Sequence, residues 1–473
     1  GSMEHDYEVI VIGGGGAGLS AACAAAELGA SVALLEAGTT VGGSTALSGG
    51  VFYAAGTSLQ KQAGIENDTA DDMYEYYMTL NQHRVNAQNV RKLCNASADA
   101  FEWLVECGVE FKPEGLYKSG IESVPRGHSP AMAGAGITQA LEVKARNLGV
   151  DIALQSRVKQ LHVVDGVVNG IQLDDDNIVT SRTVVIATGG FGHNKYLLNK
   201  YYPEAASQGD WAWCISANTC VGDGLEMGLD VGADLDGYNR GLLLPTPGFY
   251  RNLDVMLPSW LALVNREGRR FVCENIEYAV MSGVISSQLG GSAFAIFDED
   301  SKKTGKPDPQ FAAYYDSGFL TFNWSDDRIE EQLTTGKVVK ADTLAELGEK
   351  VGVVPRALEN TIKEYNESVE AGIDAQFNKT PSLIRKVARP PFYACEINPA
   401  IVCLTSAGLR MNEKAEVVDK YGDVIKGLYA AGEVTGSVLG ERYIGGGNSI
   451  CNAVVFGRIA GEQAVSACRN DNK

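Results

Sequence analysis

The sequence predicts an α/β fold in which one domain is assembled from both ends of the chain and an α+β domain is inserted between them. Near the N-terminus, an apolar strand, a glycine-rich turn, an alanine-rich helix and a second apolar strand follow one another and end at Glu36. From about Tyr238 onward, aromatic, proline and charged residues mix without any such unit. Glycine-rich strand ends of the first kind return at Thr405 and lead to a terminal helix. The expected first domain comprises residues 5–238 and 405–470, and the expected inserted domain comprises residues 239–404.

Composition and charge narrow the class of protein. The 473 residues are 45% hydrophobic and 8% aromatic, the balance of a globular protein with two or three domains. A net charge of −19 repels nucleic acid and anionic lipid, so we expect neither as a partner. No run approaches the roughly 18 apolar residues that a membrane span needs. With Gly1–Met3 set aside as a cloning remnant, a chain that starts near Met3 is expected to be soluble and cytoplasmic.

The ten cysteines are scattered along the chain, and none of them forms a C-x-x-C pair. The closest two, Cys214 and Cys220, are six positions apart. This spacing argues against a zinc ribbon and against a locally ligated iron–sulfur cluster, so we expect no metal site. Scattered cysteines in a long chain are typical of reduced thiols in a cytoplasm.

The first strand–turn–helix–strand unit carries a dinucleotide signature. Its turn reads G-G-G-G-A-G, so that Gly13, Gly15 and Gly18 match G-x-G-x-x-G. Gly13 permits a tight turn, Gly15 lets the backbone approach a pyrophosphate, and Gly18 lets the helix pack on the strand. The helix N-terminus offers free N–H groups to phosphates, and Glu36, 18 residues past Gly18, can accept ribose hydroxyls. The sequence therefore predicts a Rossmann-like nucleotide site.

Three further glycine-rich segments favour a long dinucleotide. Residues 41–50 follow the second strand and supply serine and threonine hydroxyls. Small residues also end the strands at 187–190 and at 431–433. Backbone that approaches a ligand at so many separate places suits an extended FAD better than a nicotinamide dinucleotide. No second complete unit of strand, G-x-G-x-x-G turn and helix is present, so we expect FAD and no NAD(P)H domain.

The remaining elements follow in order along the chain. Residues 68–107 are polar with a helical pattern, and residues 150–172 are typical of strands around an Asp-Gly turn. An apolar strand at 184–187 is followed by a glycine turn, a short helix and a strand within 221–235. In the inserted part, residues 342–372 contain two helical stretches. Strands that alternate with helices in the outer segments are typical of an α/β domain.

Taken together, these motifs resemble those of the flavoprotein family that includes succinate dehydrogenases, fumarate reductases and 3-ketosteroid dehydrogenases. The segments that carry the resemblance are G-G-G-G-A-G (13–18), E-A-G-T-T-V-G-G-S-T (36–45), A-T-G-G-F (187–191), V-G-D-G-L-E-M-G (221–228) and G-L-Y-A-A-G-E-V-T-G (427–436). The resemblance implies an FAD-binding domain that is not contiguous in sequence and a capping domain over the isoalloxazine ring. It also implies the following FAD contacts: Gly13, Gly15, Gly16, Ala17, Gly18, Glu36, Ala37, Gly43, Ser44, Thr45, Ser48, Gly49, Gly50, Val158, Ala187, Thr188, Gly189, Asp223, Gly432, Glu433, Asn448, Ser449 and Ile450.

Two segments near the C-terminus indicate the branch of the family. Fumarate reductases carry a pattern like H-x-T-x-G-G and an arginine before G-G-N, and these groups hold a dicarboxylate. The matching segment here is C-L-T-S-A-G at 403–408, without histidine, and Arg442 is out of register with the family's arginine. The segment G-E-R-Y-I-G-G-G at 440–447 is similar to the G-E-x-Y-P-G-x-G of 3-ketosteroid Δ1-dehydrogenases, with isoleucine in place of proline. This similarity implies that the Tyr443 hydroxyl and the Gly447 N–H bind a ketone carbonyl.

A further similarity lies in the inserted part. Residues 264–278 resemble the run V-N-x-x-G-x-R-F…N-E-x-x-x-Y of the ketosteroid enzymes, whose tyrosine transfers a proton. The resemblance implies that role for Tyr278, with Tyr53 and Tyr117 as candidate relay partners. Segments similar to those of 3-ketosteroid Δ4-dehydrogenases favour that branch, and they are residues 45–50, 59–61, 103–109, 125–130 and 408–410.

The leading hypothesis is an FAD-dependent 3-ketosteroid oxidoreductase that acts on the C4–C5 bond of ring A, with hydride transfer at flavin N5 and proton transfer by tyrosine. The alternatives are a 3-ketosteroid Δ1-dehydrogenase, a fumarate-reductase-like reductase of another enoate, and a flavin-bound electron-transfer or structural subunit. A carboxylate substrate needs an arginine at the ring, and Arg442 is the candidate. We expect a small apolar ketone, a steroid, as substrate and an electron donor or acceptor as partner, with the direction open. Candidates for the lining of an apolar pocket, or for plain core, are Trp211, Trp213, Phe249, Tyr250 and Trp260.

Overall fold

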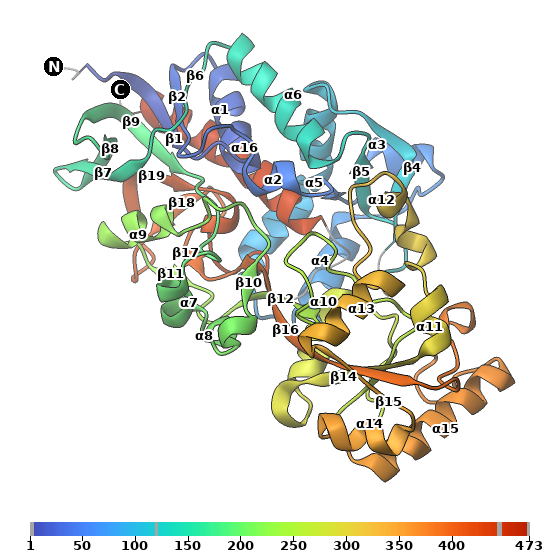
Figure 1. Cartoon of the computed structure of the whole chain (residues 1–473). Helices are drawn as coiled ribbons and strands as arrows, with labels where there is room; N and C mark the ends of the chain where they lie inside the picture. Colours follow the sequence, from blue (N-terminus) through green and yellow to red (C-terminus); the bar gives the residue numbers. More distant parts are fainter. Residues whose placement is uncertain (1–3, 119–121, 442–446, 471–473) are drawn as a thin grey trace. The chain divides into compact units, whose positions relative to one another are not determined.

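The computed structural model describes residues 4–118, 122–441 and 447–470, and it divides into two compact units (Figure 1). Unit 1 comprises Gly1–Ser207, Ser216–Leu242 and Cys403–Lys473, and unit 2 comprises Gln208–Ile215 and Leu243–Val402. Both ends of the chain therefore belong to one unit, and the predicted α/β fold is confirmed. Residues 208–215, which the sequence pattern assigned to the first part, belong to unit 2.

Unit 1 is built on a mainly parallel sheet of eight strands. The order is β18-β19-β9-β1-β2-β6, and β8 joins β9 and pairs with β7. All of β2 and most of β1 is buried, which is why both strands are continuous apolar runs rather than alternating ones. The strands are β1 (Tyr7–Ile12), β2 (Val32–Leu35), β6 (Asp151–Ala153), β7 (Val158–Val164), β8 (Val167–Leu173), β9 (Ile178–Ile186), β18 (Glu416–Val418) and β19 (Val424–Ala430).

The first and last helices of unit 1 pack directly against each other. In Figure 1 the blue α1 (Gly16–Glu27) and the red α16 (Asn448–Asn470) lie side by side. A Cβ atom added to Gly457 would lie 2.6 Å from the carbonyl oxygen of Ala17, and one added to Gly461 would lie 2.3 Å from that of Ala21. The helices therefore approach backbone to backbone, and every residue of α1 except Glu27 is buried.

Further helices and two small sheets complete unit 1. A three-stranded sheet has the order β3-β5-β4, and β11 pairs with β17. The longer α5 buries one face, with Val90, Leu93, Ser97 and Leu104 spaced as a helix requires. These elements are α2 (Gly43–Leu47), β3 (Phe52–Tyr53), α3 (Ser58–Gln62), α4 (Ala70–Leu80), α5 (Ala87–Glu106), β4 (Phe111–Tyr117), β5 (Gly127–Pro130), α6 (Ala133–Asn147), α7 (Lys195–Tyr201), α8 (Pro203–Ala206), α9 (Asp223–Asp230), β11 (Leu235–Asp236) and β17 (Gly408–Leu409).

Unit 2 is organised around the long strand β16, which continues into unit 1. This strand pairs antiparallel with β14 and β15 and parallel with β10, while β13 pairs with β14. An aromatic core of Trp260, Phe297, Trp324 and Tyr393 lies against this sheet. The elements are β10 (Trp213–Cys214), β12 (Gly241–Thr246), β13 (Ala262–Val264), α10 (Tyr278–Ser286), β14 (Ala293–Asp298), α11 (Glu299–Thr304), α12 (Ala312–Asp316), α13 (Asp326–Thr335), β15 (Val338–Ala341), α14 (Leu344–Val351), α15 (Pro355–Ala371) and β16 (Phe392–Thr405).

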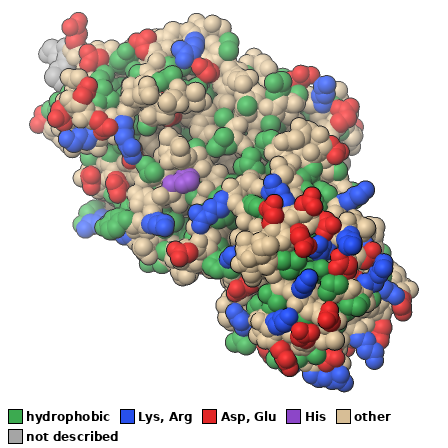
Figure 2. All heavy atoms as spheres, viewed as in Figure 1, with side chains coloured by type: hydrophobic (Ala, Val, Ile, Leu, Met, Phe, Trp, Pro, Cys, Tyr) green, Lys and Arg blue, Asp and Glu red, His purple; other side chains and the backbone are tan. Residues whose placement is uncertain are grey.

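The surface carries both signs of charge. On the face drawn in Figure 2, acidic and basic side chains are intermixed, and hydrophobic side chains are scattered between them. Among the helices that the structure describes, none combines the length and the apolar composition that crossing a membrane requires.

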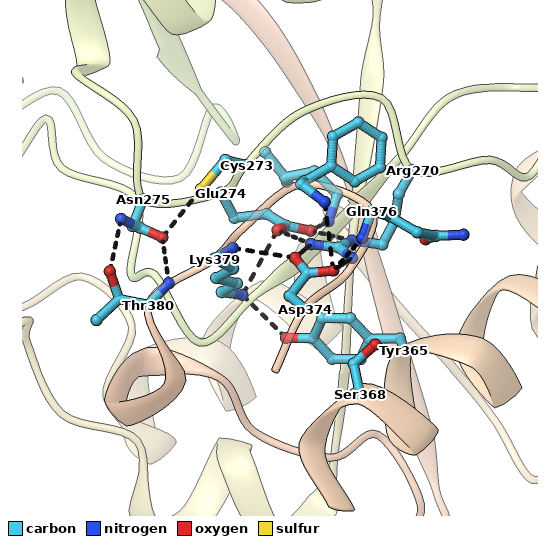
Figure 3. Close-up of polar contacts among 12 residues, drawn as sticks. Arg270, Cys273, Glu274, Asn275, Tyr365, Ser368, Asp374, Gln376, Lys379 and Thr380 are labelled. Carbon is cyan, nitrogen blue, oxygen red and sulfur yellow. Dashed lines mark hydrogen bonds and ion pairs between the residues drawn. The ribbon is translucent and has the colours of Figure 1, made fainter. Parts of the chain in front are cut away.

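A cluster of buried ionic side chains lies inside unit 2 (Figure 3). Arg270 makes two hydrogen bonds to Glu274, at 2.6 and 3.0 Å, and two to Asp374, at 2.9 and 3.1 Å. Lys379 donates to the Tyr365 hydroxyl at 2.9 Å and lies 3.7 Å from Glu274. Burial lowers the pKa of Lys379 to about 8. Burial would raise the pKa of Asp374, but hydrogen bonds from Arg270 and from backbone N–H groups outweigh it and lower the pKa to about 2. The cluster joins segments about a hundred residues apart.

We expect the substitution Arg270→Met to destabilise unit 2 strongly. It would leave the carboxylates of Glu274 and Asp374 buried without their cation, and breaking a buried ion pair in this way costs about 3–5 kcal/mol. Urea unfolding monitored by tryptophan fluorescence measures the loss. The matched control is Arg356→Met, because Arg356 is 80% exposed and lies 3.8 Å from Glu359. We expect that control to change the free energy of unfolding by less than about 0.5 kcal/mol, and equal effects of the two substitutions would contradict the interpretation.

Candidate functional site

The glycine-rich turn lies between β1 and α1, as the sequence predicts. Gly13 has a φ of +103°, and a Cβ atom there would lie 2.1 Å from the carbonyl oxygen of Ala187. A Cβ atom at Gly18 would lie 1.7 Å from the carbonyl oxygen of Gly13. Helix α1 then begins with Gly16, Ala17 and Gly18, has no acidic residue in its first turn and receives no side-chain cap from Gly15. Its N-terminal N–H groups therefore suit an anionic ligand such as a pyrophosphate.

Glu36 follows the end of β2 and is tied to this turn. Its Oε1 accepts a hydrogen bond from Gly14 N at 2.9 Å, and its Oε2 accepts one from Gly38 N at 2.6 Å. The carboxylate is only 7% exposed, and Ala37 follows it directly. Each carboxylate oxygen keeps a further lone pair, so Glu36 can accept hydroxyl hydrogens of a ribose while it holds the turn.

The loop before α2 runs against the turn. Gly42 N donates to Gly14 O at 2.8 Å, and Gly42 also forms a parallel bridge with Gly15. A Cβ atom at Gly43 would lie 3.2 Å from the Cα of Gly15. Two predicted cofactor segments that are separated in the sequence are thus one continuous backbone surface.

The hydroxyl groups of this loop bind the protein's own backbone. Ser44 Oγ accepts from Ala217 N at 3.1 Å. Ser48 Oγ donates to Thr45 O at 2.7 Å and accepts from Gly50 N at 3.1 Å, with Gly49 between them. These bonds shape the loop, so the predicted role of Ser44 and Ser48 at the cofactor includes the support of its backbone.

Buried polar atoms without partners mark two other predicted positions. Among the residues that the structure describes, Thr188 Oγ1 and Asn448 Oδ1 are buried and have no hydrogen-bond partner. Thr188 lies between Ala187 and Gly189 after β9, and Asn448 begins α16, followed by Ser449 and Ile450. A buried polar group is normally satisfied, so both atoms fit contacts to a bound ligand.

The carboxyl group of Glu433 lies against the backbone of Gly190, just after β9. The side chain is partly buried, and its carboxyl accepts hydrogen bonds from the backbone of Gly190 and from the backbone and side chain of Thr405. Burial is the larger influence and raises the pKa of Glu433 from 4.5 to about 8. The preceding Gly432 has a φ of +85°. Glu433 is therefore a carboxyl group that holds its proton at neutral pH and can donate a hydrogen bond.

The predicted FAD contacts Val158 and Asp223 lie where the start of β7 meets the start of α9 in unit 1. Asp223 is the first residue of α9 and forms two 2.8 Å bonds with the Arg157 guanidinium. Val158 follows Arg157 in the sequence; it is buried and begins β7. The Asp223 carboxylate is thus already held by an arginine, in contact with the strand that carries Val158.

The predicted catalytic residues belong to both units. Tyr278 is the first residue of α10 in unit 2. Gly447 belongs to unit 1, and its carbonyl oxygen accepts from Tyr53 N at 3.2 Å and from Cys451 N at 3.0 Å. Gly447 has a φ of +100°, and a Cβ atom there would lie 2.7 Å from Val51 O, so glycine is required. Tyr443 and Arg442 lie outside the described residues.

The structure places the candidate relay residue Tyr53 in a buried polar network. Its hydroxyl donates to Glu122 and lies 3.3 Å from Arg126 Nη1, and Arg126 in turn binds Asp68 at 2.9 Å. Burial, with the Glu122 charge, raises the pKa of Tyr53 well above its usual range. A phenol that holds its proton so firmly suits a structural role better than a relay. Tyr117 is half-buried at the end of β4.

The strand end at residues 403–408 carries no histidine. Cys403 stands first in this segment, where the family pattern begins with histidine, and its carbonyl oxygen accepts from Ser216 Oγ at 3.4 Å. Thr405 and Ser406 are buried, and Ser406 Oγ accepts from Gly440 N at 3.0 Å. The small side chain of Ser406 therefore supports the backbone at Gly440.

The predicted aromatic residues of unit 2 separate into two groups. Trp260 is core: it packs against Phe297 and Trp324, and its Nε1 donates to Lys306 O at 2.9 Å. Trp211, Trp213 and Tyr250 line a cavity of about 180 Å³, together with Asp210, Gly248, Arg251 and Lys337. Charged residues are part of this lining, so it is not that of a purely apolar pocket.

Sequence patterns did not indicate Tyr77 on α4 or Asn81, which caps the C-terminus of that helix. Both are buried, and both bind the backbone of the segment that precedes α16. The sequence signal is a tyrosine in the last turn of an amphipathic helix and an asparagine directly after it.

The residues of unit 1 fit FAD. The turn and helix start suit the pyrophosphate, Glu36 suits a ribose, and the buried Thr188 and Asn448 atoms require partners that described side chains do not supply. A family model described as an FAD binding domain matches residues 8–450. Geometry and match together confirm FAD as the cofactor.

Individual known proteins are similar over nearly the whole chain. The fumarate reductase (cytochrome) of Shewanella frigidimarina is 33% identical over 477 residues, which cover 98% of this chain and 78% of that protein. The NADH:acrylate oxidoreductase of Vibrio harveyi is 31% identical, with 98% of this chain and 51% of that protein covered. The solved structure of 3-ketosteroid-Δ4-(5α)-dehydrogenase from Rhodococcus jostii RHA1 in complex with 4-androstene-3,17-dione is 27% identical, with a TM-score of 0.77 and 98% of each chain covered.

We expect the substitution Glu36→Gln to weaken FAD binding. The change removes a charged acceptor of hydrogen bonds, and such bonds contribute about 1.5–3 kcal/mol, which corresponds to a roughly ten- to hundredfold rise in the dissociation constant. Titration of the FAD-free protein with FAD, followed by quenching of flavin fluorescence, measures it. Glu142→Gln, in α6 and far from the turn in sequence, serves as the control. An unchanged dissociation constant in Glu36→Gln would show that this carboxylate does not hold the cofactor.

We expect the FAD-free protein to lose stability as the pH rises from about 5 to about 8. In this range the unfolded Glu433 carboxyl is ionised while the folded one, with its pKa at about 8, keeps its proton. The unfolded state then binds fewer protons, so the free energy of unfolding falls with rising pH, by a few kcal/mol at most. Glu433→Gln removes this titration and should flatten the dependence of Tm on pH, whereas Glu462→Gln should not. Parallel pH profiles for the wild type and Glu433→Gln would refute the assignment.

Proposed function

The chain belongs to the FAD-binding flavoprotein family that includes the fumarate reductases, and we propose that it acts on the C4–C5 bond of ring A in a 3-ketosteroid. The proposed enzyme is an FAD-dependent oxidoreductase, and its proposed substrate is neutral and carries a carbonyl group. Dehydrogenation removes a hydride from C5 and a proton from C4, and enone reduction adds them at the same atoms.

In this mechanism the residues of the chain polarise a carbonyl and move a proton. Bound FAD supplies the hydride acceptor or donor at its N5 atom. The Gly447 N–H and the Tyr443 hydroxyl donate to the C3 carbonyl oxygen and stabilise the negative charge that develops there, as in an oxyanion hole. Tyr278 exchanges the C4 proton.

The observation that carries the proposal is the strand end at residues 403–408. Fumarate reductases place there a histidine that holds a dicarboxylate, and this chain has Cys403 with the buried hydroxyls of Thr405 and Ser406. A neutral ketone needs hydrogen-bond donors and no histidine cation at this place. The likeness to the 3-ketosteroid-Δ4-(5α)-dehydrogenase, which covers 98% of both chains, supports the same substrate class.

A second candidate function is the reduction of a small enoate. The higher identities, 33% to a fumarate reductase and 31% to an acrylate oxidoreductase, favour it. A carboxylate substrate needs a cation, and two arginines lie near Glu441, the residue before Arg442. Arg84 pairs with Glu441 at 3.1 Å, and Arg240 Nη1 donates to Arg84 O at 2.8 Å. Arg84 and Arg442 are therefore the residues that this candidate would use.

Anaerobic absorbance titrations of the FAD-loaded protein test the proposal. We expect 5α-androstane-3,17-dione to bleach oxidised FAD, or 4-androstene-3,17-dione to reoxidise reduced FAD, and the stronger response gives the direction. Tyr278→Phe should slow this reaction at least about a hundredfold with unchanged FAD content, because it removes a proton-transfer group. Tyr314→Phe in α12 is the control and should react at the wild-type rate.

The contrary outcomes separate the two candidates. If neither steroid changes the flavin spectrum while cinnamate or acrylate reoxidises reduced FAD, the steroid proposal fails and the enoate candidate replaces it. In that case Arg84→Ala should raise the KM for the acid. If no steroid and no acid changes the spectrum, both candidates fail.

A further inference from the structure

Two backbone stems flank the segment that contains Tyr443. The first stem, Val438–Glu441, precedes it, and the second, Gly447 and the start of α16 at Asn448, follows it. Tyr77 on α4 contacts both: its hydroxyl donates to Val438 O at 2.5 Å and accepts from Asn448 Nδ2 at 3.3 Å. Asn448 Nδ2 also lies 3.4 Å from Leu439 O. One phenol oxygen therefore joins the two stems.

Asn81, the residue that caps the C-terminus of α4, holds the first stem at a second point. Its Oδ1 accepts from Glu441 N at 3.1 Å, and its Nδ2 donates to Tyr77 O at 3.1 Å. A Cβ atom at Gly440 would lie 2.3 Å from Asn81 Oδ1, so the amide side chain lies directly against the stem backbone. Gly440 N in turn donates to Ser406 Oγ at 3.0 Å.

These contacts are shielded from water. Tyr77 and Asn448 are 0% exposed and Asn81 is 4% exposed. Burial raises the pKa of Tyr77 far above its usual range, so the hydroxyl keeps its proton and remains a donor to Val438. Water cannot replace a lost partner at such a position, and each group left unpaired carries its full desolvation cost.

The second stem sets the place of Gly447. This residue precedes Asn448, and its carbonyl oxygen is held by Tyr53 N and Cys451 N. With the carbonyl fixed on one side and Asn448 fixed by Tyr77 on the other, the peptide group between Gly447 and Asn448 has little freedom. The place of the Gly447 backbone therefore depends on a contact made by α4.

We propose that Tyr77 is a positioning residue, whose hydroxyl ties the Val438 stem to the Asn448 stem and so holds Gly447 in the orientation that binds a substrate carbonyl. The identity of the bound group rests on the proposed function, whereas the tie between the stems does not. By this role Tyr77 acts through Gly447 and touches no substrate. The substitution Tyr77→Phe removes this hydroxyl and keeps the ring and its packing.

Hydrogen–deuterium exchange of the FAD-loaded protein tests the tie between the stems. In Tyr77→Phe we expect the amides of Gly440, Glu441 and Cys451 to exchange about tenfold faster than in the wild type, because their stem loses a buried hydrogen bond. The control is Tyr74→Phe on the same helix, where the Tyr74 ring packs under Arg91 at 3.9 Å, and exchange should not change. Wild-type exchange at these amides in Tyr77→Phe would overturn the tie.

Binding and turnover test the positioning role. For 4-androstene-3,17-dione we expect Tyr77→Phe to raise the dissociation constant and the KM about tenfold and to change kcat by less than about twofold. A smaller population of correctly oriented Gly447 lowers apparent affinity but leaves the bound complex as reactive as before. Faster exchange with unchanged KM would overturn the positioning role while the tie remains.

Two further measurements keep the outcomes distinct. If the wild type does not respond to 4-androstene-3,17-dione at all, the proposed function fails, and exchange alone then decides whether Tyr77 ties the stems. If Tyr77→Phe does not fold with FAD, Asn81→Ala replaces it, since that change frees only Glu441 N from α4. We then expect faster exchange at Glu441, and wild-type exchange there would show that α4 does not hold the first stem and would overturn the proposal.

Discussion

The backbone contact between α1 and α16 is the constraint on which unit 1 depends. Ala17 contacts Gly457 and Ala21 contacts Gly461, so the two helices run in the same direction. The first nine residues of α16 therefore precede this contact and extend about 12 Å past the start of α1, at 1.5 Å per residue. The same contact that joins the chain ends thus carries the start of α16, with Asn448, away from the glycine-rich turn.

The cofactor part of the site could be predicted from the sequence because its requirements are local. The turn at Gly13 and Gly18 needs glycine for contacts made within a few residues or by the adjacent strand, and such needs leave a motif. The family, the α/β fold and FAD were all confirmed on this basis. Even Glu36, whose carboxylate binds the turn itself, is marked by its position after a buried strand.

Contacts between distant segments left no such mark. Tyr77 and Val438 are 361 positions apart, and Arg270 and Asp374 are 104 apart. In each case the local sequence pattern around the residue is ordinary for its helix or loop, and only the tertiary fold determines which distant residue it contacts. Tyr77 is one buried position of an amphipathic helix, and Asp374 follows the end of one. For the same reason the sequence pattern did not group residues 208–215 with unit 2: their strand β10 pairs with β16, about 190 positions later.

The chemistry of the strand end explains why a tie such as Tyr77 matters in this chain. A histidine or arginine holds a carboxylate through charge, and charge tolerates some error in direction. Where Cys403 stands in place of that histidine, the carbonyl of the proposed ketone substrate depends on neutral N–H and O–H donors. Hydrogen bonds of this kind weaken steeply once the angle falls toward about 120°. A site built from them needs its backbone fixed, and the proposed tie of both stems by the buried Tyr77 on α4 would supply that fixity at Gly447. The neutral strand end and the tied stems are therefore two parts of one requirement.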